Sequence, residues 1–319
     1  MSGGVLLHGT PRFFWELVFY SLTWATEALC FSAASHPRKG TDMLHSFEIA
    51  SGTITGRHHI SVGRGSQDAL CVLATKQAIV GVVCDGCGSE AHSEVGAHLM
   101  SRRIAQNFLI LAKAAPMAHP QDLMGLSNSH LLEDLAEISR FLGGDRKQAI
   151  FDHLLFSVVG FVVGLHWSFI FYSGDGWWWG GTSVNVKDGL FSNQILPAEG
   201  NQPDYPGYML LANDRTKFDL KLSAYYETKN LSVIGAGTDG LTDFVENKET
   251  LMPGRADKVG PLSQFWTEDR YYANPDAIRR KLWLCAQEHR RADWNEQQIL
   301  KTPGLLLDDT SLICVRRKA

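Results

Sequence analysis

The spacing of apolar residues along the chain predicts the secondary structure. Apolar runs of strand length, bounded by Gly, Asp or Pro, predict β-strands. They cover residues 69–75, 78–84, 155–163, 167–172, 231–234 and 311–316, and a further strand should follow the glycine-rich turn at residues 173–181. Residues 46–60 are rich in β-branched side chains and are also expected to form strands. The strands come in groups with helices between the groups, which favours an α+β fold.

Three helices are predicted from apolar positions at helical spacing. The first begins at Ser89 or Ser93 and ends before Pro116. Its apolar face contains Ala97, Met100, Ile104, Phe108 and Leu111. The second begins near Ser129 and stops at the glycine pair 143–144, and the third covers residues 275–290 with a basic outer face. The apolar segment at residues 13–35 contains Glu16 and Glu27, so we expect a packing helix or a leader over residues 1–42, followed by one domain over residues 43–319.

Composition and charge exclude several classes of protein. The 319 residues are 45% hydrophobic and 20% charged, which permits a large core, and the net charge of −4 is unlike that of a nucleic-acid-binding domain. No run reaches the roughly 18 uncharged apolar residues of a membrane span. The six cysteines are too few for a disulfide scaffold, so we expect a cytoplasmic protein with no nucleic-acid or membrane partner.

Aspartates recur where apolar strands begin or end. They are Asp85, Asp175, Asp239 and the pair Asp308–Asp309. Neighbouring strands would bring these carboxylates to one edge of a sheet, where their mutual repulsion calls for a hard cation. Oxygen-only ligands suit Mg²⁺, Mn²⁺ or Ca²⁺ rather than zinc. The alternative is that each Asp-Gly pair merely forms a turn.

Five motifs in order resemble those of the protein phosphatase 2C family, the metal-dependent serine/threonine phosphatases, and the bacterial branch is the most similar. They are Gly65-Ser66-Gln67-Asp68-Ala69, Val83-Cys84-Asp85-Gly86-Cys87-Gly88, Ser173-Gly174-Asp175-Gly176, Thr238-Asp239-Gly240-Leu241-Thr242-Asp243 and Asp308-Asp309-Thr310-Ser311. The resemblance runs from about Gly56 to Val315. It implies an α-β-β-α sandwich, in which two central antiparallel sheets are flanked by helices, and it makes residues 43–319 the catalytic domain.

The resemblance also implies a site and a reaction. Two Mn²⁺ or Mg²⁺ ions would activate a bridging water that hydrolyses a phosphoprotein substrate, and the enzyme is expected to be a monomer. Asp85 would bridge the ions, the Gly86 carbonyl would contact one of them, and Asp239 and Asp308 would complete the other shell. Asp308 is preferred over Asp309 on motif register. Asp175 and Asp239 would hold a third, weaker ion, and Asp68 would orient metal-bound water.

Three residues depart from the family pattern. Gln67 stands where many members have Glu, so a metal contact there would bind more weakly than a carboxylate would. Cys87 stands where many members have His. Arg64, the candidate phosphate-binding arginine, lies four residues before Asp68 rather than five, and Arg57, His58 and His59 are further candidates. These departures leave a second hypothesis open, in which a catalytically degenerate member serves as a regulatory or phosphoprotein-binding module.

Other motifs carry weaker hypotheses. Residues 235–240 (GAGTDG) fit a dinucleotide-binding fingerprint, but no βαβ unit surrounds them. Cys84 and Cys87 have the spacing of a redox pair or a zinc ligand pair, without a second pair. The run Trp177-Trp178-Trp179 predicts either rings packed in the core and under neighbouring loops, or a partner-binding patch.

Overall fold

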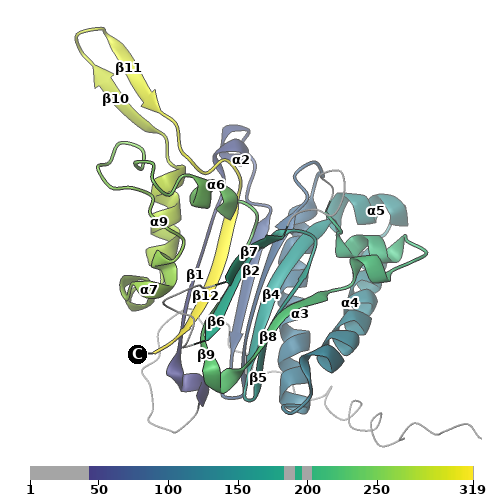
Figure 1. The fold of residues 1–319 in the computed structure, drawn as a ribbon. Helices are drawn as coiled ribbons and strands as arrows, with labels where there is room; N and C mark the ends of the chain where they lie inside the picture. Colours follow the sequence, from purple (N-terminus) through teal and green to yellow (C-terminus); the bar gives the residue numbers. More distant parts are fainter. Residues whose placement is uncertain (1–42, 183–190, 196–202, 319) are drawn as a thin grey trace, which may run out of the picture. The chain divides into compact units, whose positions relative to one another are not determined.

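Two five-stranded antiparallel sheets form the centre of the structure (Figure 1). The computed structural model describes residues 43–182, 191–195 and 203–318; the predicted leader, residues 1–42, lies outside this part. Sheet A has the order β1 (Phe47–Ile54), β12 (Thr310–Arg317), β9 (Leu231–Gly237), β6 (Gly176–Thr182) and β7 (Phe191–Ile195). Sheet B has the order β2 (Asp68–Ala74), β3 (Ala78–Gly86), β4 (Phe156–Gly164), β5 (Trp167–Ser173) and β8 (Lys221–Glu227).

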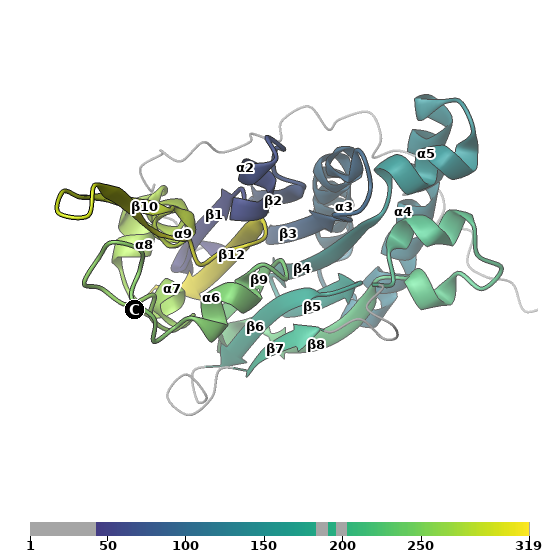
Figure 2. The ribbon, with the colours of Figure 1, turned by 90° about the horizontal axis from the view of Figure 1, so that it is seen from above.

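The two sheets pack face to face through an apolar layer. Phe161 and Ile170 of sheet B meet Ile234 and Ile313 of sheet A in this layer. The outer face of sheet B packs on α3 (Ser93–Ala114), α4 (Pro120–Leu142) and α5 (Arg146–His153). The outer face of sheet A packs on α6 (Leu241–Glu246), α7 (Gln264–Thr267), α8 (Arg270–Ala273) and α9 (Ala277–Ala286), as the view in Figure 2 shows. The predicted α-β-β-α sandwich is therefore confirmed.

The sequence pattern explains these layers. Every residue of β4 is buried, because side chains on one face enter the layer between the sheets and those on the other face meet the helices. The predicted apolar face of α3 is buried from Ala97 to Leu111. Trp177 and Trp179 lie in the core beneath the helices of sheet A, and Trp178 lies between the sheets. The interpretation of this run as a partner-binding patch is wrong, since all three side chains are at most 9% exposed.

Several predicted boundaries differ from the structure. The segment predicted as a glycine-rich turn over residues 173–181 is mostly strand, because β6 begins at Gly176. The strand predicted over residues 46–60 ends at Ile54, and a short helix, α2 (Arg57–Ser61), follows Gly56. The second predicted helix starts at Pro120 rather than near Ser129, because a proline at the first helical position loses no hydrogen bond and has the required φ.

Short 3₁₀ turns cover Met43–Ser46, Pro206–Leu210, Thr216–Phe218 and Thr228–Asn230. None of the helices in the described ranges has the length and apolar character needed to cross a bilayer.

The largest difference concerns residues 275–290. The helix predicted there ends at Ala286, and the chain then forms a separate hairpin of β10 (His289–Asp293) and β11 (Gln298–Thr302). Arg290 and Arg291 therefore belong to a strand instead of a basic helix face. The turn of the hairpin contains Gln297 with φ of 49°, a conformation that ends regular pairing at this point.

Candidate active site

Carboxylates from both sheets meet at one end of the sandwich. Asp68 opens β2 and lies opposite Asp85, near the end of β3, in the antiparallel register. Asp239 follows β9, and its carboxyl group is hydrogen-bonded to that of Asp85. Asp175 lies between β5 and β6, and Asp308 lies just before β12. The structure thus brings together the five aspartates that the sequence singled out; we call them the carboxylate cluster.

The carboxylates of this cluster repel one another strongly. Burial raises the pKa of Asp85 well above its ordinary value, and the charges of Asp239, Asp68, Asp308 and Asp175 raise it further. Burial raises the pKa of Asp239 to about 6, and Asp175 and Asp308 add to the effect. Burial also raises the pKa of Asp175, although a hydrogen bond from Ser157 opposes this change. A cluster with these shifts favours bound protons or bound cations.

The two carboxylate oxygens of Asp68 differ, because only one of them accepts a hydrogen bond within the described structure. Its side chain is 3% exposed. The Thr238 hydroxyl donates to Oδ2 at 2.7 Å, whereas Oδ1 is buried without a hydrogen-bond partner. Burial raises the pKa of Asp68 well above its ordinary value, and the hydrogen bond from Thr238 lowers it in part. A buried carboxylate oxygen without a partner is costly, so Oδ1 is suited to accept a hydrogen bond from a water or to contact a cation.

The side-chain amide of Gln67 also has one hydrogen-bonded atom, Nε2, and one buried atom without a partner, Oε1. Its side chain is 1% exposed. The amide Nε2 donates to the Ser93 hydroxyl and to the Cys87 carbonyl, the latter at 3.3 Å. Oε1 is buried without a partner. The amide therefore holds the loop after β3, while its oxygen is free to contact a water or a cation.

Asp308 and Asp309 have opposite environments. Asp309 is 2% exposed, and its two oxygens accept from the backbone N–H groups of Gly56 at 2.7 Å and Gln67 at 2.5 Å. His59 Nδ1 also lies 2.9 Å from Asp309 Oδ2. Asp308 is exposed and accepts one backbone N–H, that of Asp309, at 2.8 Å. Asp309 is engaged in holding the chain, and Asp308 retains an oxygen for a ligand.

Two glycines let the backbone approach this segment closely. A Cβ on Gly56 would lie 2.2 Å from the Asp308 carbonyl carbon, and a Cβ on Gly240 would lie 2.0 Å from the Asp309 carbonyl oxygen. Neither position tolerates a side chain, because real Cβ atoms do not approach backbone so closely. The glycines therefore fix Asp308 beside Asp239, which directly precedes Gly240.

Arg64 lies in the loop between α2 and β2, and its guanidinium already donates hydrogen bonds to the backbone. It donates to the carbonyl oxygens of Gly88 at 3.0 Å, Ala91 at 3.0 Å and Glu90. These bonds tie the segment before β2 to the loop that follows β3. A phosphate contact by Arg64 stays a prediction, and the structure gives the side chain a loop-holding role that the sequence did not indicate.

Three other side chains near the cluster make contacts that the sequence did not predict. His59, proposed as a phosphate contact, is buried beside Asp309. Thr238 fixes Asp68, and its position directly before Asp239 was the available signal. Tyr205 forms a hydrogen bond with Cys87, and burial raises the pKa of its hydroxyl, with Asp85 and Asp175 contributing. Nothing in the local sequence of Tyr205 indicated this placement.

The donor set of the cluster fits divalent cations. The strand-end aspartates offer carboxylate oxygens, Gln67 offers an amide oxygen, and hard cations prefer such ligands. His59, Asp308 and Asp309 also place possible ligand atoms within 4.8 Å of one another. Two oxygens, Asp68 Oδ1 and Gln67 Oε1, are buried and unpartnered. Bound cations would relieve the repulsion that raises the pKa values of the cluster.

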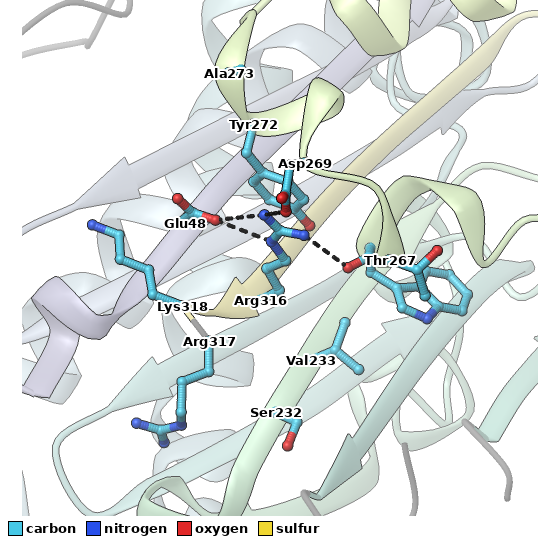
Figure 3. A pocket seen from close by; sticks show the side chains of 11 residues that line it. Glu48, Ser232, Val233, Thr267, Asp269, Tyr272, Ala273, Arg316, Arg317 and Lys318 are labelled. Carbon is cyan, nitrogen blue, oxygen red and sulfur yellow. Dashed lines mark hydrogen bonds and ion pairs between the residues drawn. The ribbon is translucent and has the colours of Figure 1, made fainter. Parts of the chain in front are cut away.

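A pocket of about 890 Å³ lies at the opposite end of sheet A (Figure 3). Its central side chain, Arg316, is near the end of β12, whereas Asp308 precedes the start of that strand. Arg316 pairs with Glu48 at 2.9 Å and Asp269 at 2.6 Å, and it stacks on Tyr272. The Arg316 guanidinium thus makes its contacts within the protein. The pocket is separate from the carboxylate cluster.

The comparisons with known proteins concern the family and the fold of the chain. The family model for protein phosphatase 2C matches residues 55–148. This range contains Arg64, Gln67, Asp68, Asp85 and Gly86, and the remaining three aspartates of the cluster lie outside it. No curated protein matches the sequence. The chain thus resembles the protein phosphatase 2C family, as its motifs predicted.

Two solved phosphatase structures are similar to this chain. The serine/threonine phosphatase of S. agalactiae matches with a TM-score of 0.50 and 11% identity, over 85% of this chain and 100% of that one. Stp1, a serine/threonine phosphatase from Staphylococcus aureus, matches with a TM-score of 0.49 and 14% identity, over 90% of this chain and 100% of that one. At these identities the likeness concerns the fold.

Proposed function

We propose that this chain is a metal-dependent phosphoprotein phosphatase that hydrolyses phosphoserine or phosphothreonine. The observation that carries the proposal is the convergence of Asp68, Asp85, Asp175, Asp239 and Asp308 from both sheets at one end of the sandwich. The sequence motifs and the family match over residues 55–148 support the same reaction class.

Specific residues would hold the metal. Asp85, the Gly86 carbonyl, Asp239 and Asp308 would ligate two Mn²⁺ or Mg²⁺ ions, with Gln67 as a weaker contact. Asp175 and Asp239 would serve a third ion. When bound, the ions would supply an activated water and neutralise negative charge on the phosphoryl group. Asp308 serves better than Asp309 because both oxygens of Asp309 accept backbone N–H groups.

The chain's own side chains position the reactants. Thr238 fixes Oδ2 of Asp68. Oδ1 would then orient a water by accepting a hydrogen bond from it. Arg64 and Gln67 hold the loop after β3 against β2, which keeps Asp85 and Gly86 in register with Asp68. Catalysis of this kind depends mainly on positioning and charge stabilisation.

A second candidate function is a phosphoprotein-binding module without catalysis. Two departures from the family pattern favour it: the neutral Gln67 stands where many members have Glu, and Cys87 stands where many have His. We further propose a cytoplasmic location, supported by a cysteine content too low for a disulfide scaffold, and action as a monomer.

Phosphate release from an aryl phosphate and from a phosphothreonine peptide tests the proposal. Hydrolysis should require Mn²⁺ or Mg²⁺ and stop in EDTA. Asp85→Asn should lower turnover by about 100-fold or more, since a metal ligand is lost. Hydrolysis that persists after exhaustive chelation would contradict a metal-dependent mechanism. Peptide binding without hydrolysis at any metal concentration would favour the binding module.

A further inference from the structure

The hairpin β10–β11 projects beyond the end of the sheets where α2 and α6 lie, as Figure 1 shows. Nine of its ten strand residues are exposed, and Asp293 is half-buried. The turn residue Trp294 is 87% exposed. An isolated two-stranded hairpin gains little stability from its own packing, so its side chains are available for contact with another molecule.

The strand register divides the hairpin into two faces. Residues paired across the strands share a face, and successive residues alternate between faces. Arg290 pairs with Lys301, and Ala292 pairs with Ile299; we call these four residues the basic face. Arg291 pairs with Leu300 on the opposite face.

The basic face is directed toward α2. Arg290 Nε donates to Glu288 at 2.5 Å. The pKa of Glu288 is lowered mainly by Arg290, with smaller effects from Lys301 and from Arg57 of α2. The opposite face, to which His289 belongs, is directed toward Gly254. The ring of His289 lies 2.3 Å from the position that a Cβ on Gly254 would take.

The charges near the basic face would attract an acidic segment. Three cations, Arg57, Arg290 and Lys301, act on the one carboxylate of Glu288. Ile299 adds an apolar surface that is 62% exposed. Lys301 of this face lies within about 25 Å of Asp308, because it is seven residues before Asp308 and an extended chain of that length spans at most that distance.

We propose that the basic face receives an extended acidic segment of the phosphoprotein substrate while the phosphoresidue occupies the carboxylate cluster; this inference rests on the proposed phosphatase function. Arg290 and Lys301 would pair with acidic side chains of the substrate, and Ile299 would contact an apolar one. The carboxylate cluster itself repels acidic residues, so a separate cationic surface is needed to favour such a substrate.

The test compares charge reversals on the two faces in the full chain with Mn²⁺. Arg290→Glu and Lys301→Glu alter the basic face, and Arg291→Glu is the matched control on the opposite face. The probes are an aryl phosphate, a phosphothreonine peptide with acidic residues about six to ten positions from the phosphoresidue, and the same peptide with Gln in place of each acidic residue.

Arg290→Glu and Lys301→Glu should each lower kcat/KM for the acidic peptide by about five- to tenfold, with a smaller loss at high salt. The Gln peptide and the aryl phosphate should change less than twofold, and Arg291→Glu should leave the rates for all three probes close to those of the unmodified chain. An equal loss for Arg290→Glu and Arg291→Glu, or an equal loss for both peptides, would overturn the hairpin's role. Failure of the unmodified chain to hydrolyse the aryl phosphate would instead overturn the phosphatase function on which that role rests.

Discussion

Thr238 donates its hydroxyl to Oδ2 of Asp68 across a distance of 2.7 Å, and this bond joins the two sheets at the carboxylate cluster. Thr238 follows β9 of sheet A, whereas Asp68 opens β2 of sheet B. The same Thr238 oxygen accepts the backbone N–H of Ser311 at 2.9 Å. One hydroxyl therefore sets both the spacing of the sheets and the orientation of the Asp68 carboxylate.

Thr238→Val should lower turnover by about tenfold or more, because Asp68 loses the hydrogen bond that Thr238 donates to Oδ2 and a misplaced group is costly in catalysis. The hydrogen bond lowers the pKa of Asp68, so its removal should move the acid limb of the pH–rate profile to higher pH. Thr238→Ser should restore both turnover and profile. Loss of turnover without a change in the profile would assign Thr238 a purely structural role.

Asp85→Asn should stabilise the metal-free protein at neutral pH by about 1 kcal/mol or more, since it removes a repelling charge from the cluster. The folded-state pKa values of these aspartates are raised, so stability is highest below the unfolded pKa and falls as pH rises through the folded pKa, which is about 6 for Asp239. Thermal unfolding in EDTA at about pH 5 and about pH 7.5 should show a larger decline for the unmodified chain than for Asp85→Asn. A variant that is less stable at both pH values would contradict this account.

Arg64→Ala should destabilise the fold by about 1–3 kcal/mol, because three carbonyl oxygens lose a charged donor. Arg102→Ala, an exposed arginine on α3, is the control and should change stability little. Denaturant unfolding measures the difference. A phosphate-binding role would show a different pattern, in which KM for an aryl phosphate rises while stability stays unchanged.

Gln67→Glu should lower the Mn²⁺ concentration needed for half-maximal activity, because a carboxylate binds a hard cation more strongly than an amide does. The variant should also be less stable without metal, since Nε2 no longer donates to the Cys87 carbonyl. Titration calorimetry and thermal unfolding in EDTA check the two effects. An unchanged Mn²⁺ requirement would remove Gln67 from the metal contacts and leave it as a loop-holding residue.

The sequence predicted the features that depend on local pattern and chain order. The apolar runs located β3, β4 and β12, and aspartates at strand ends were expected to share one edge of a sheet. The structure places Asp68 opposite Asp85 in adjacent strands. The face of α3 followed from its helical spacing alone.

Features that depend on long-range contacts could not be predicted. Motif register alone favoured Asp308 over Asp309, and it gave no reason for their different environments. Their hydrogen bonds distinguish the buried Asp309 from the exposed Asp308. Arg290 and Arg291 continued the basic pattern of α9, but pairing with residues 298–302 placed them in a strand. Arg64 was predicted to bind phosphate from its spacing in sequence before Asp68. Its hydrogen bonds in the structure depend instead on the position of the loop after β3.

Anomalous diffraction from Mn²⁺-containing crystals tests the central claim, that the carboxylate cluster is a metal centre, most directly. The account predicts two strong peaks within coordinating distance of Asp85, with Asp239 and Asp308 among the ligands and Asp309 absent from them. Asp85→Asn crystals should lose at least one peak. Peaks confined to His59 and Asp309, or no peak beside Asp85 at saturating Mn²⁺, would contradict the account.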